Sequence, residues 1–225
     1  GMDLAEHWRA IRGRLGVCQQ DNTLDPDLTV EENLLVFAGY FKLPLGERKK
    51  RSEELLDFFQ LTAKRKNKVV DLSGGMARRL MLARSLIGNP ELLILDEPST
   101  GLDPQSRHLL WERVEELKRE GLSILLTTHY MEEAEYLCDR LVIVDHGKIL
   151  IEGEPKQLIQ EHAGRMVFEI EEPGQALIDF VTAEGHRHDV LSRRLLVYGE
   201  EQHGIFDDII EKFAPPQRTL RLGTL

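Results

Sequence analysis

Apolar residues recur at helical spacing through much of the first half of the chain. Thr29 and Glu32 are three residues apart, the spacing of a capping box, and they precede such an apolar series. Two more helical patterns follow, over residues 47–60 and 75–88. Residues 27–90 are therefore expected to form a helical subdomain.

Short apolar runs alternate with helical patterns in the middle of the chain. Residues 92–95 form a continuous apolar run of the kind found in strands buried on both faces, and residues 123–128 and 141–144 form similar runs. The helix between the first two is expected to begin at Asp103, a capping residue followed by proline. Strands that alternate with helices predict an α/β fold with a parallel sheet.

The chain from residue 164 onward shows a different order of elements. The patterns predict strand, helix, strand, strand, helix and strand, at residues 166–170, 175–182, 189–191, 195–198, 205–213 and 219–222. This is the order of a ferredoxin-like split unit. We therefore expect two domains, residues 1–163 and a small α+β domain at 164–225.

Charge and composition exclude several classes of protein. Lys and Arg number 29 against 39 Asp and Glu, so the net charge is −10, which argues against nucleic acid as a general partner. The longest apolar run, residues 34–41, is far too short to span a membrane as a helix. The only cysteines, Cys18 and Cys138, fit a reducing compartment and are expected to be buried as small hydrophobic residues.

Two carboxylates, Asp96 and Glu97, follow the apolar run at residues 92–95. Ligands of parallel sheets bind at the carboxyl ends of the strands. An aspartate there can hold hydrated Mg²⁺, and a neighbouring glutamate can orient and deprotonate the water that attacks a phosphoryl group. An acidic pair can equally cap a strand and open a loop, so this pair alone assigns no site.

Three other features have two interpretations each. Ser73, Gly74 and Gly75 precede a helix and could receive an anion at its positive end, or they could be a plain serine cap with two flexible glycines. His129 follows an apparent strand and could contact a phosphate or a reacting water, although most single histidines do neither. Gln20 could bind a metal ion or water, but by itself it indicates nothing.

The order of these features resembles, motif by motif, the nucleotide-binding domain of ATP-binding cassette (ABC) proteins, over about residues 12–158. The matching features are Gln20, residues 72–76, residues 96–98, residues 99–103 and His129. The runs at residues 21–34, 76–80 and 127–135 are most similar to subunits of antibiotic, polysaccharide or nodulation-signal exporters. The resemblance implies a P-loop NTPase-like cassette with a helical subdomain and a small appendage.

The resemblance also implies catalytic and metal-binding residues. Glu97 matches the general base and His129 the switch histidine, so both are expected to act in catalysis. Asp96 matches the aspartate of the Mg²⁺ site, and Gln20 matches the glutamine that senses Mg²⁺ and water and faces the membrane subunit. The implied cofactors are therefore ATP and Mg²⁺.

Further residues are implied to contact nucleotide across a dimer. Ser73, Gly74 and Gly75 match the signature that grips the γ-phosphate held by the opposite protomer, and Asp103 matches the loop aspartate that communicates between protomers. Gln20 is counted with these nucleotide-binding residues. The implied partners are a second ATP-binding subunit and a membrane-spanning permease, which places the protein in the cytoplasm at the inner face of the cell membrane.

The sequence departs from the family in one respect. It contains no Gly-x-x-x-x-Gly-Lys-Ser/Thr phosphate loop, and only nineteen residues precede Gln20. The chain as printed is therefore expected to lack ATPase activity on its own. A cassette without that segment would expose sheet edges and apolar surface, which predicts self-association.

Three functions remain open at this stage. The first is the ATP-binding subunit of an exporter, which couples ATP hydrolysis to transport. The second is a non-catalytic interaction module that donates its signature motif to a complete partner protomer. The third, a cassette protein acting on ribosomes or DNA, is disfavoured by the acidic balance of the chain.

Overall fold

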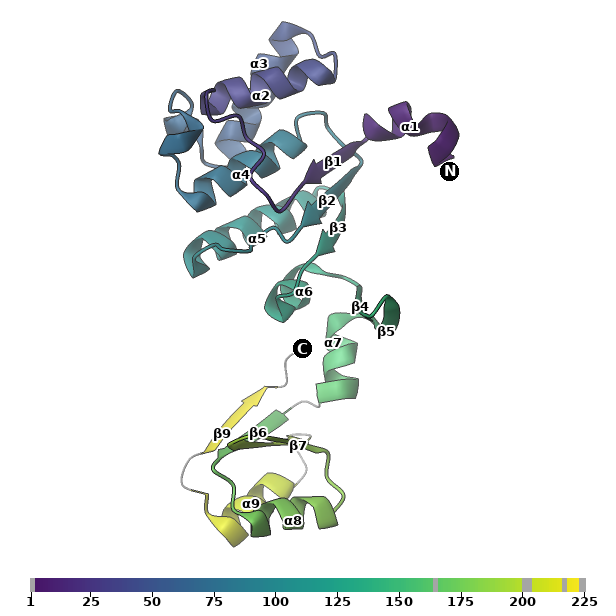
Figure 1. Cartoon of the computed structure of the whole chain (residues 1–225), viewed down its shortest axis with the longest axis vertical. Coiled ribbons are helices and arrows are strands. Elements are labelled where there is room, and N and C mark those ends of the chain that lie inside the picture. The colour runs from purple at the N-terminus through teal and green to yellow at the C-terminus, as the bar shows by residue number, and fades with distance from the viewer. Residues whose placement is uncertain (1–2, 164–165, 200–203, 216–217, 223–225) are drawn as a thin grey trace. The chain divides into compact units, whose positions relative to one another are not determined.

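The structure is a computed structural model that describes all residues except 1–2, 164–165, 200–203, 216–217 and 223–225. It forms two compact units, residues 1–129 and 130–225 (Figure 1). The expected start of the second domain, residue 164, lies outside the described residues, and the domain boundary at 163/164 stays a prediction. In the described part of the chain, no helix is long and apolar enough to cross a membrane.

A parallel sheet of three strands organises the first unit. The strands lie in the order β1 (Leu15–Cys18), β2 (Leu92–Asp96) and β3 (Ser123–Thr127). Val17 pairs with Ile94, which pairs in turn with Leu125. The sheet confirms the predicted α/β class, and all three strands present their carboxyl ends at the same edge.

One face of this sheet is covered by helix α4 (Gly74–Ser85). A Cβ at Gly16 of β1 would lie 2.5 Å from the carbonyl oxygen of Ser85, so the end of the helix approaches the strand closely. Cys18 and Leu95 are buried on the covered side. Helix α5 (Pro104–Arg119) packs against α4 and begins at the predicted cap, Asp103.

The opposite face of the sheet is apolar and open to solvent. Val17 is 50% exposed and Leu125 is 56% exposed, and both lie in the same cross-strand row. Within the sheet as described, β1 and β3 are the two edges. The apolar surface expected from the sequence is therefore present, while self-association through it stays a prediction.

Helices and turns between β1 and β2 form the block that was predicted for residues 27–90. Its elements are α2 (Val30–Tyr40), α3 (Leu45–Phe58), η1 (Thr62–Lys64), η2 (Val69–Asp71) and α4. The predicted capping box is present, because Thr29 N donates to Glu32 Oε2 at 2.8 Å and Glu32 N donates to Thr29 Oγ1 at 3.2 Å. Helix α1 (Leu4–Arg12), capped by Asp3, had not been predicted.

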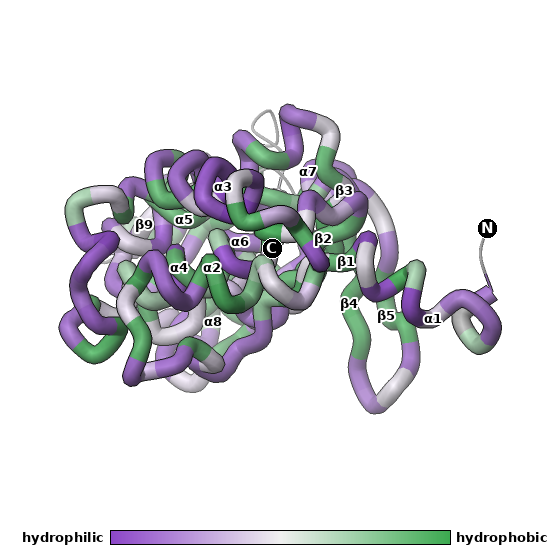
Figure 2. Tube along the Cα trace, turned by 90° about the horizontal axis from the view of Figure 1, so that it is seen from above, coloured by the Kyte–Doolittle hydropathy of each residue, from purple (hydrophilic) through white to green (hydrophobic). Residues whose placement is uncertain are grey.

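The second unit begins with a helix and a hairpin. These elements are α6 (Met131–Leu137), β4 (Leu141–Asp145), β5 (Lys148–Gly153), α7 (Pro155–Leu158) and η3 (Ile159–Ala163). The expectation that residues 141–144 form part of the parallel sheet is wrong, because β4 pairs with β5 in antiparallel orientation. His146 and Gly147 have φ values of 46° and 72°, as a tight hairpin turn requires. Figure 2 shows hydrophobic colouring along the two strands of this hairpin.

The rest of the second unit is an antiparallel sheet with two helices. The elements follow the predicted order: β6 (Met166–Glu171), α8 (Gln175–Ala183), β7 (His188–Leu191), β8 (Arg194–Gly199), α9 (Ile205–Phe213) and β9 (Arg218–Leu222). The strands are arranged β7-β8-β6-β9, as in a split βαβ unit. Phe168, Val181, Leu195 and Ile209 are buried in its core between sheet and helices.

Candidate functional site

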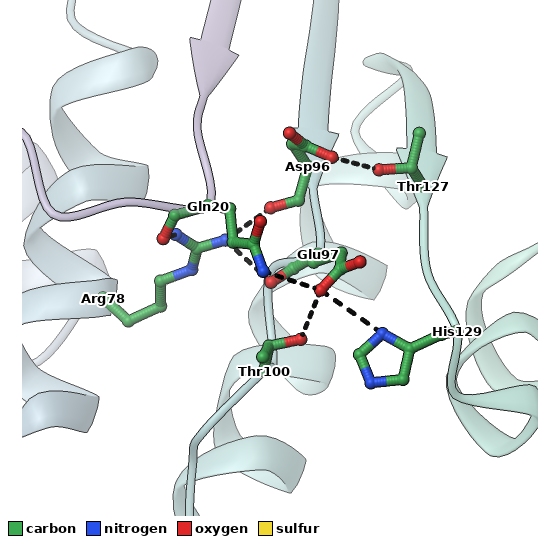
Figure 3. Close-up of polar contacts among 7 residues, drawn as sticks. All are labelled: Gln20, Arg78, Asp96, Glu97, Thr100, Thr127 and His129. Carbon is green, nitrogen blue, oxygen red and sulfur yellow. Dashed lines mark hydrogen bonds and ion pairs between the residues drawn. The ribbon is translucent and has the colours of Figure 1, made fainter.

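The carboxyl ends of the three parallel strands bring several predicted residues together (Figure 3). Asp96 is the last residue of β2, and Glu97 follows it directly. Gln20 lies two residues beyond β1, and His129 lies two residues beyond β3. Residues that are far apart in the sequence meet here because parallel strands end at one edge of their sheet.

Oε2 of Glu97 is the centre of this cluster. Nε2 of Gln20 donates to it at 2.9 Å, and Oγ1 of Thr100 donates to it at 3.1 Å. Nδ1 of His129 lies 3.3 Å from the same oxygen. Three groups thus orient one carboxylate oxygen, while the partly exposed side chain retains a second oxygen that can accept a proton from water.

The backbone of Glu97 has an unusual conformation. Its φ is 43°, in the left-handed region that non-glycine residues rarely occupy. Its amide donates to the carbonyl oxygen of Thr127 at 3.0 Å, and its own carbonyl accepts from the amide of Thr100 at 3.3 Å. Strained conformations of this kind persist where the surrounding structure fixes them, and they cluster at functional sites. The Glu97 side chain points toward Gln20 and His129 (Figure 3).

Asp96 lies beside this cluster with an exposed side chain. One of its oxygens, Oδ1, accepts a hydrogen bond from Oγ1 of Thr127 at 2.5 Å. Within the described ranges, no group of three or more His, Cys, Asp and Glu side chains is arranged to hold a metal ion. One carboxylate with amide and water oxygens nevertheless suits Mg²⁺, which keeps several waters and takes substrate phosphate oxygens as ligands.

Ser73, Gly74 and Gly75 differ in their surroundings. Ser73 caps α4, and its Oγ accepts from the amide of Met76 at 3.3 Å. A Cβ at Gly74 would meet no atom within 4 Å, so a ligand has open access there. A Cβ at Gly75 would lie 2.5 Å from Oγ of Ser106, so the packing of α4 against α5 by itself favours glycine at this position.

Asp103 lies next to this second group as the cap of α5. Its Oδ1 accepts a hydrogen bond from the amide of Ser106 at 3.0 Å. Hydrogen bonds from the side chain and backbone of Ser106 hold the pKa of Asp103 below its usual range. The predicted residues therefore form two groups, one around Glu97 and one where the first turns of α4 and α5 meet.

Sequence reasoning assigned no site role to three residues that complete the first group: Thr100, Thr127 and Arg78. Thr100 and Thr127 lie in runs that were noted for other residues. Arg78 is buried on α4, and its guanidinium reaches the loops that bear Gln20 and Glu97. Nothing in the sequence singles out Arg78, because the main-chain groups that it contacts leave no residue-specific pattern there.

The sequence of this chain is similar to those of known proteins. A family model described as "ABC transporter" matches residues 1–100. "Nod factor export ATP-binding protein I" of Burkholderia thailandensis is 48% identical over 194 residues, which are 86% of this chain and 64% of that protein. The protein of the same name from Ralstonia nicotianae is 50% identical over 170 residues, 76% of this chain and 53% of that protein. The chain thus spans less than two thirds of either relative.

Solved structures show the same fold. One titled "Structure of ATP binding subunit of ABC transporter" is 33% identical with a TM-score of 0.62, and the match covers 73% of this chain and 68% of that chain. A dimeric ATP-binding cassette in a post-hydrolysis state, bound to ADP and Pi, is 26% identical with a TM-score of 0.59, over 68% of each chain. The chain therefore belongs to the ABC transporter ATP-binding family, whose cassettes bind ATP.

Proposed function

We propose that this chain is part of the ATP-binding subunit of an exporter, in which ATP hydrolysis drives transport across a membrane. The observation that carries the proposal is the Glu97 carboxylate, which Gln20, Thr100 and His129 surround at the end of β2. A carboxylate held in this way suits a general base that accepts a proton from the attacking water. His129 would contact the reacting phosphate or water beside it.

Mg²⁺ and the nucleotide would use neighbouring residues. Asp96 and the side-chain oxygen of Gln20 would hold Mg²⁺, directly or through water. When bound, the ion neutralises charge that develops on the phosphate oxygens. Ser73 and Gly74 would bind the γ-phosphate at the amino end of α4, where backbone amides and the helix dipole favour an anion.

The proposed partners follow from the relatives. The curated relatives are named for Nod factor export, and one structural relative is a dimeric cassette. We infer that this chain works with a second ATP-binding subunit and with a membrane permease, at the inner face of the cell membrane. In such a dimer Ser73 and Gly74 would serve the nucleotide of the opposite protomer, with Asp103 at the protomer boundary.

Calorimetric titration with Mg-ATP tests the proposal. The chain as printed is compared with a fusion that places a phosphate-loop segment of this family ahead of residue 1. We expect no measurable heat from the chain and saturable binding by the fusion. A folded fusion that binds no nucleotide would contradict the proposal, and tight binding by the chain alone would require nucleotide contacts at other residues.

The second candidate function is a non-catalytic module that donates its signature motif to a complete partner. The open space beside Gly74 favours it, because a partner's nucleotide can approach the α4 terminus there. Addition of the chain to a complete subunit should then raise its ATPase rate. Gly74→Asp should remove the effect, since a carboxylate would repel the phosphate.

Gly46 provides the matched control for this mixing experiment. It also lies in the first turn of a helix, α3, and a Cβ there would meet no atom within 4 Å. An aspartate in a first turn is favourable for the helix dipole in both variants. Gly46→Asp should therefore retain the stimulation, and equal loss with both variants would contradict a specific role for Gly74.

A further inference from the structure

Arg78 is a buried cation in the first half of α4. The residue is only 7% exposed, although its guanidinium carries a positive charge. A buried charge is costly unless its hydrogen-bonding groups are all satisfied. The acceptors around this side chain therefore indicate what the surrounding structure uses it for.

All five N–H groups of the guanidinium donate to main-chain carbonyl oxygens. The acceptors belong to the loop after β1 and to the end of β2 with the loop that follows it. Figure 3 shows Arg78 between Gln20 on one side and Asp96 and Glu97 on the other. Nε donates to Pro98 at 2.7 Å, Nη1 to Gln19 and to Gln20 at 3.0 Å, and Nη2 to Asp96 at 2.8 Å and Glu97 at 3.0 Å.

These hydrogen bonds join three elements through one side chain. Nη1 holds the loop that bears Gln20, while Nε and Nη2 hold the loop that bears Asp96 and Glu97. The side chains of Gln20 and Glu97 then meet at 2.9 Å. The planar fork of arginine reaches both loops at once, whereas the three donors of lysine radiate from a single atom.

We propose that Arg78 is a positioning residue, which fixes the Gln20 loop and the Glu97 loop to each other and to the signature helix α4. Arg78 lies five positions after Ser73, the cap of α4, so a ligand that shifts the α4 terminus would shift both loops with it. The identity of that ligand as a nucleotide rests on the proposed function. The positioning by Arg78 does not.

Hydrogen–deuterium exchange on the full printed chain, without nucleotide, tests this role. In Arg78→Gln we expect amide exchange to rise roughly tenfold in both loops, residues 19–24 and 97–102, because a charged set of hydrogen bonds is lost. The amides of β2 that pair within the sheet should keep their protection. A purely structural role would instead raise exchange evenly through the first unit.

Arg79 provides a matched control on the same helix. Its Nη1 donates to the carbonyl oxygen of Phe59 at 2.8 Å, in the helical block rather than in either loop. Arg79→Gln should therefore leave the exchange of both loops as in the wild type. Equal effects of the two variants on the loops would overturn the proposal, as would unchanged loops in Arg78→Gln.

Chemical rescue covers the case in which loss of the side chain disturbs folding. In Arg78→Ala, added methylguanidinium should restore protection in both loops together, while methylammonium at the same concentration should not. Rescue by both cations, or by neither in a folded variant, would contradict positioning by a planar fork. Because no nucleotide is present, failure of this test is distinct from failure of the fusion to bind ATP.

Discussion

Gly75→Ala is expected to destabilise the first unit through a clash between two helices. The added Cβ would lie 2.5 Å from Oγ and 2.9 Å from Cβ of Ser106, distances that real Cβ atoms essentially never show. Gly74→Ala is the matched control, since its Cβ would meet nothing within 4 Å. The two variants add the same atom to neighbouring residues of one helix.

The size of the effect follows from two opposing terms. Overpacking of this kind costs about 1–3 kcal/mol. Replacement of glycine by alanine stabilises a helix by up to about 1 kcal/mol, and this stabilisation is common to both variants. The free energy of unfolding of Gly75→Ala should therefore be lower than that of Gly74→Ala by about 1–3 kcal/mol.

Urea denaturation measures this difference. With a slope of about 1–3 kcal/mol per molar urea, the unfolding midpoint of Gly75→Ala should be lower by roughly 1 M. Ser106→Gly removes both clashing atoms, so it should cost less in the Gly75→Ala background than in the wild type. A midpoint for Gly75→Ala equal to or above that of Gly74→Ala would refute the packing argument.

Three other predictions concern thiols, acid stability and association. Cys18 is 1% exposed as expected, whereas Cys138 is only partly buried, so the expectation that both cysteines are buried is wrong for Cys138. Because burial also raises the pKa of the Cys18 thiol, a thiol reagent should label Cys138 in the native state and Cys18 only on unfolding. Equal labelling rates would contradict the fold. The pKa of Asp103 is lower in the folded protein than that of an ordinary aspartate. The ionised side chain therefore stabilises the fold above the ordinary aspartate pKa, and this contribution is lost as the pH falls through the pKa of the folded protein. The unfolding temperature of Asp103→Asn should therefore fall less on acidification than that of the wild type. Unfolding temperatures that fall in parallel with pH in the two proteins would contradict this prediction. Sedimentation should show that the chain self-associates, and Leu125→Glu on the open sheet face should shift it toward the monomer. A monomeric wild type would contradict self-association.

Local signals in the sequence were sufficient for most of the elements. The Thr29–Glu32 capping box and the Asp103 cap each satisfy backbone groups within a few residues, so their helices begin where the pattern predicts. The hairpin at His146 and Gly147 was missed because residues 141–144 had been assigned to the parallel sheet, whereas β4 pairs with β5 in antiparallel orientation. Pairing between strands depends on the whole fold, and a run of apolar residues does not specify it.

Part of the candidate site could be predicted from the sequence and part could not. That Gln20, Glu97 and His129 gather at one sheet edge follows from parallel strands alone, once the strands are recognised. The packing role of Gly75 against Ser106 depends on how closely two helices approach, which the sequence does not reveal. The same holds for Arg78, because its five acceptors are backbone carbonyls and main-chain groups leave no residue-specific pattern.

The role of Glu97 as general base is the central claim about this site. In the fusion that carries a phosphate-loop segment, single-turnover hydrolysis of Mg-ATP should be abolished by Glu97→Gln while calorimetric binding is retained. Glutamine keeps the size of the side chain and an oxygen acceptor but cannot take a proton from water. Loss of turnover with intact binding is the result that the geometry predicts, whereas hydrolysis at the rate of the parent fusion would remove Glu97 from the chemistry.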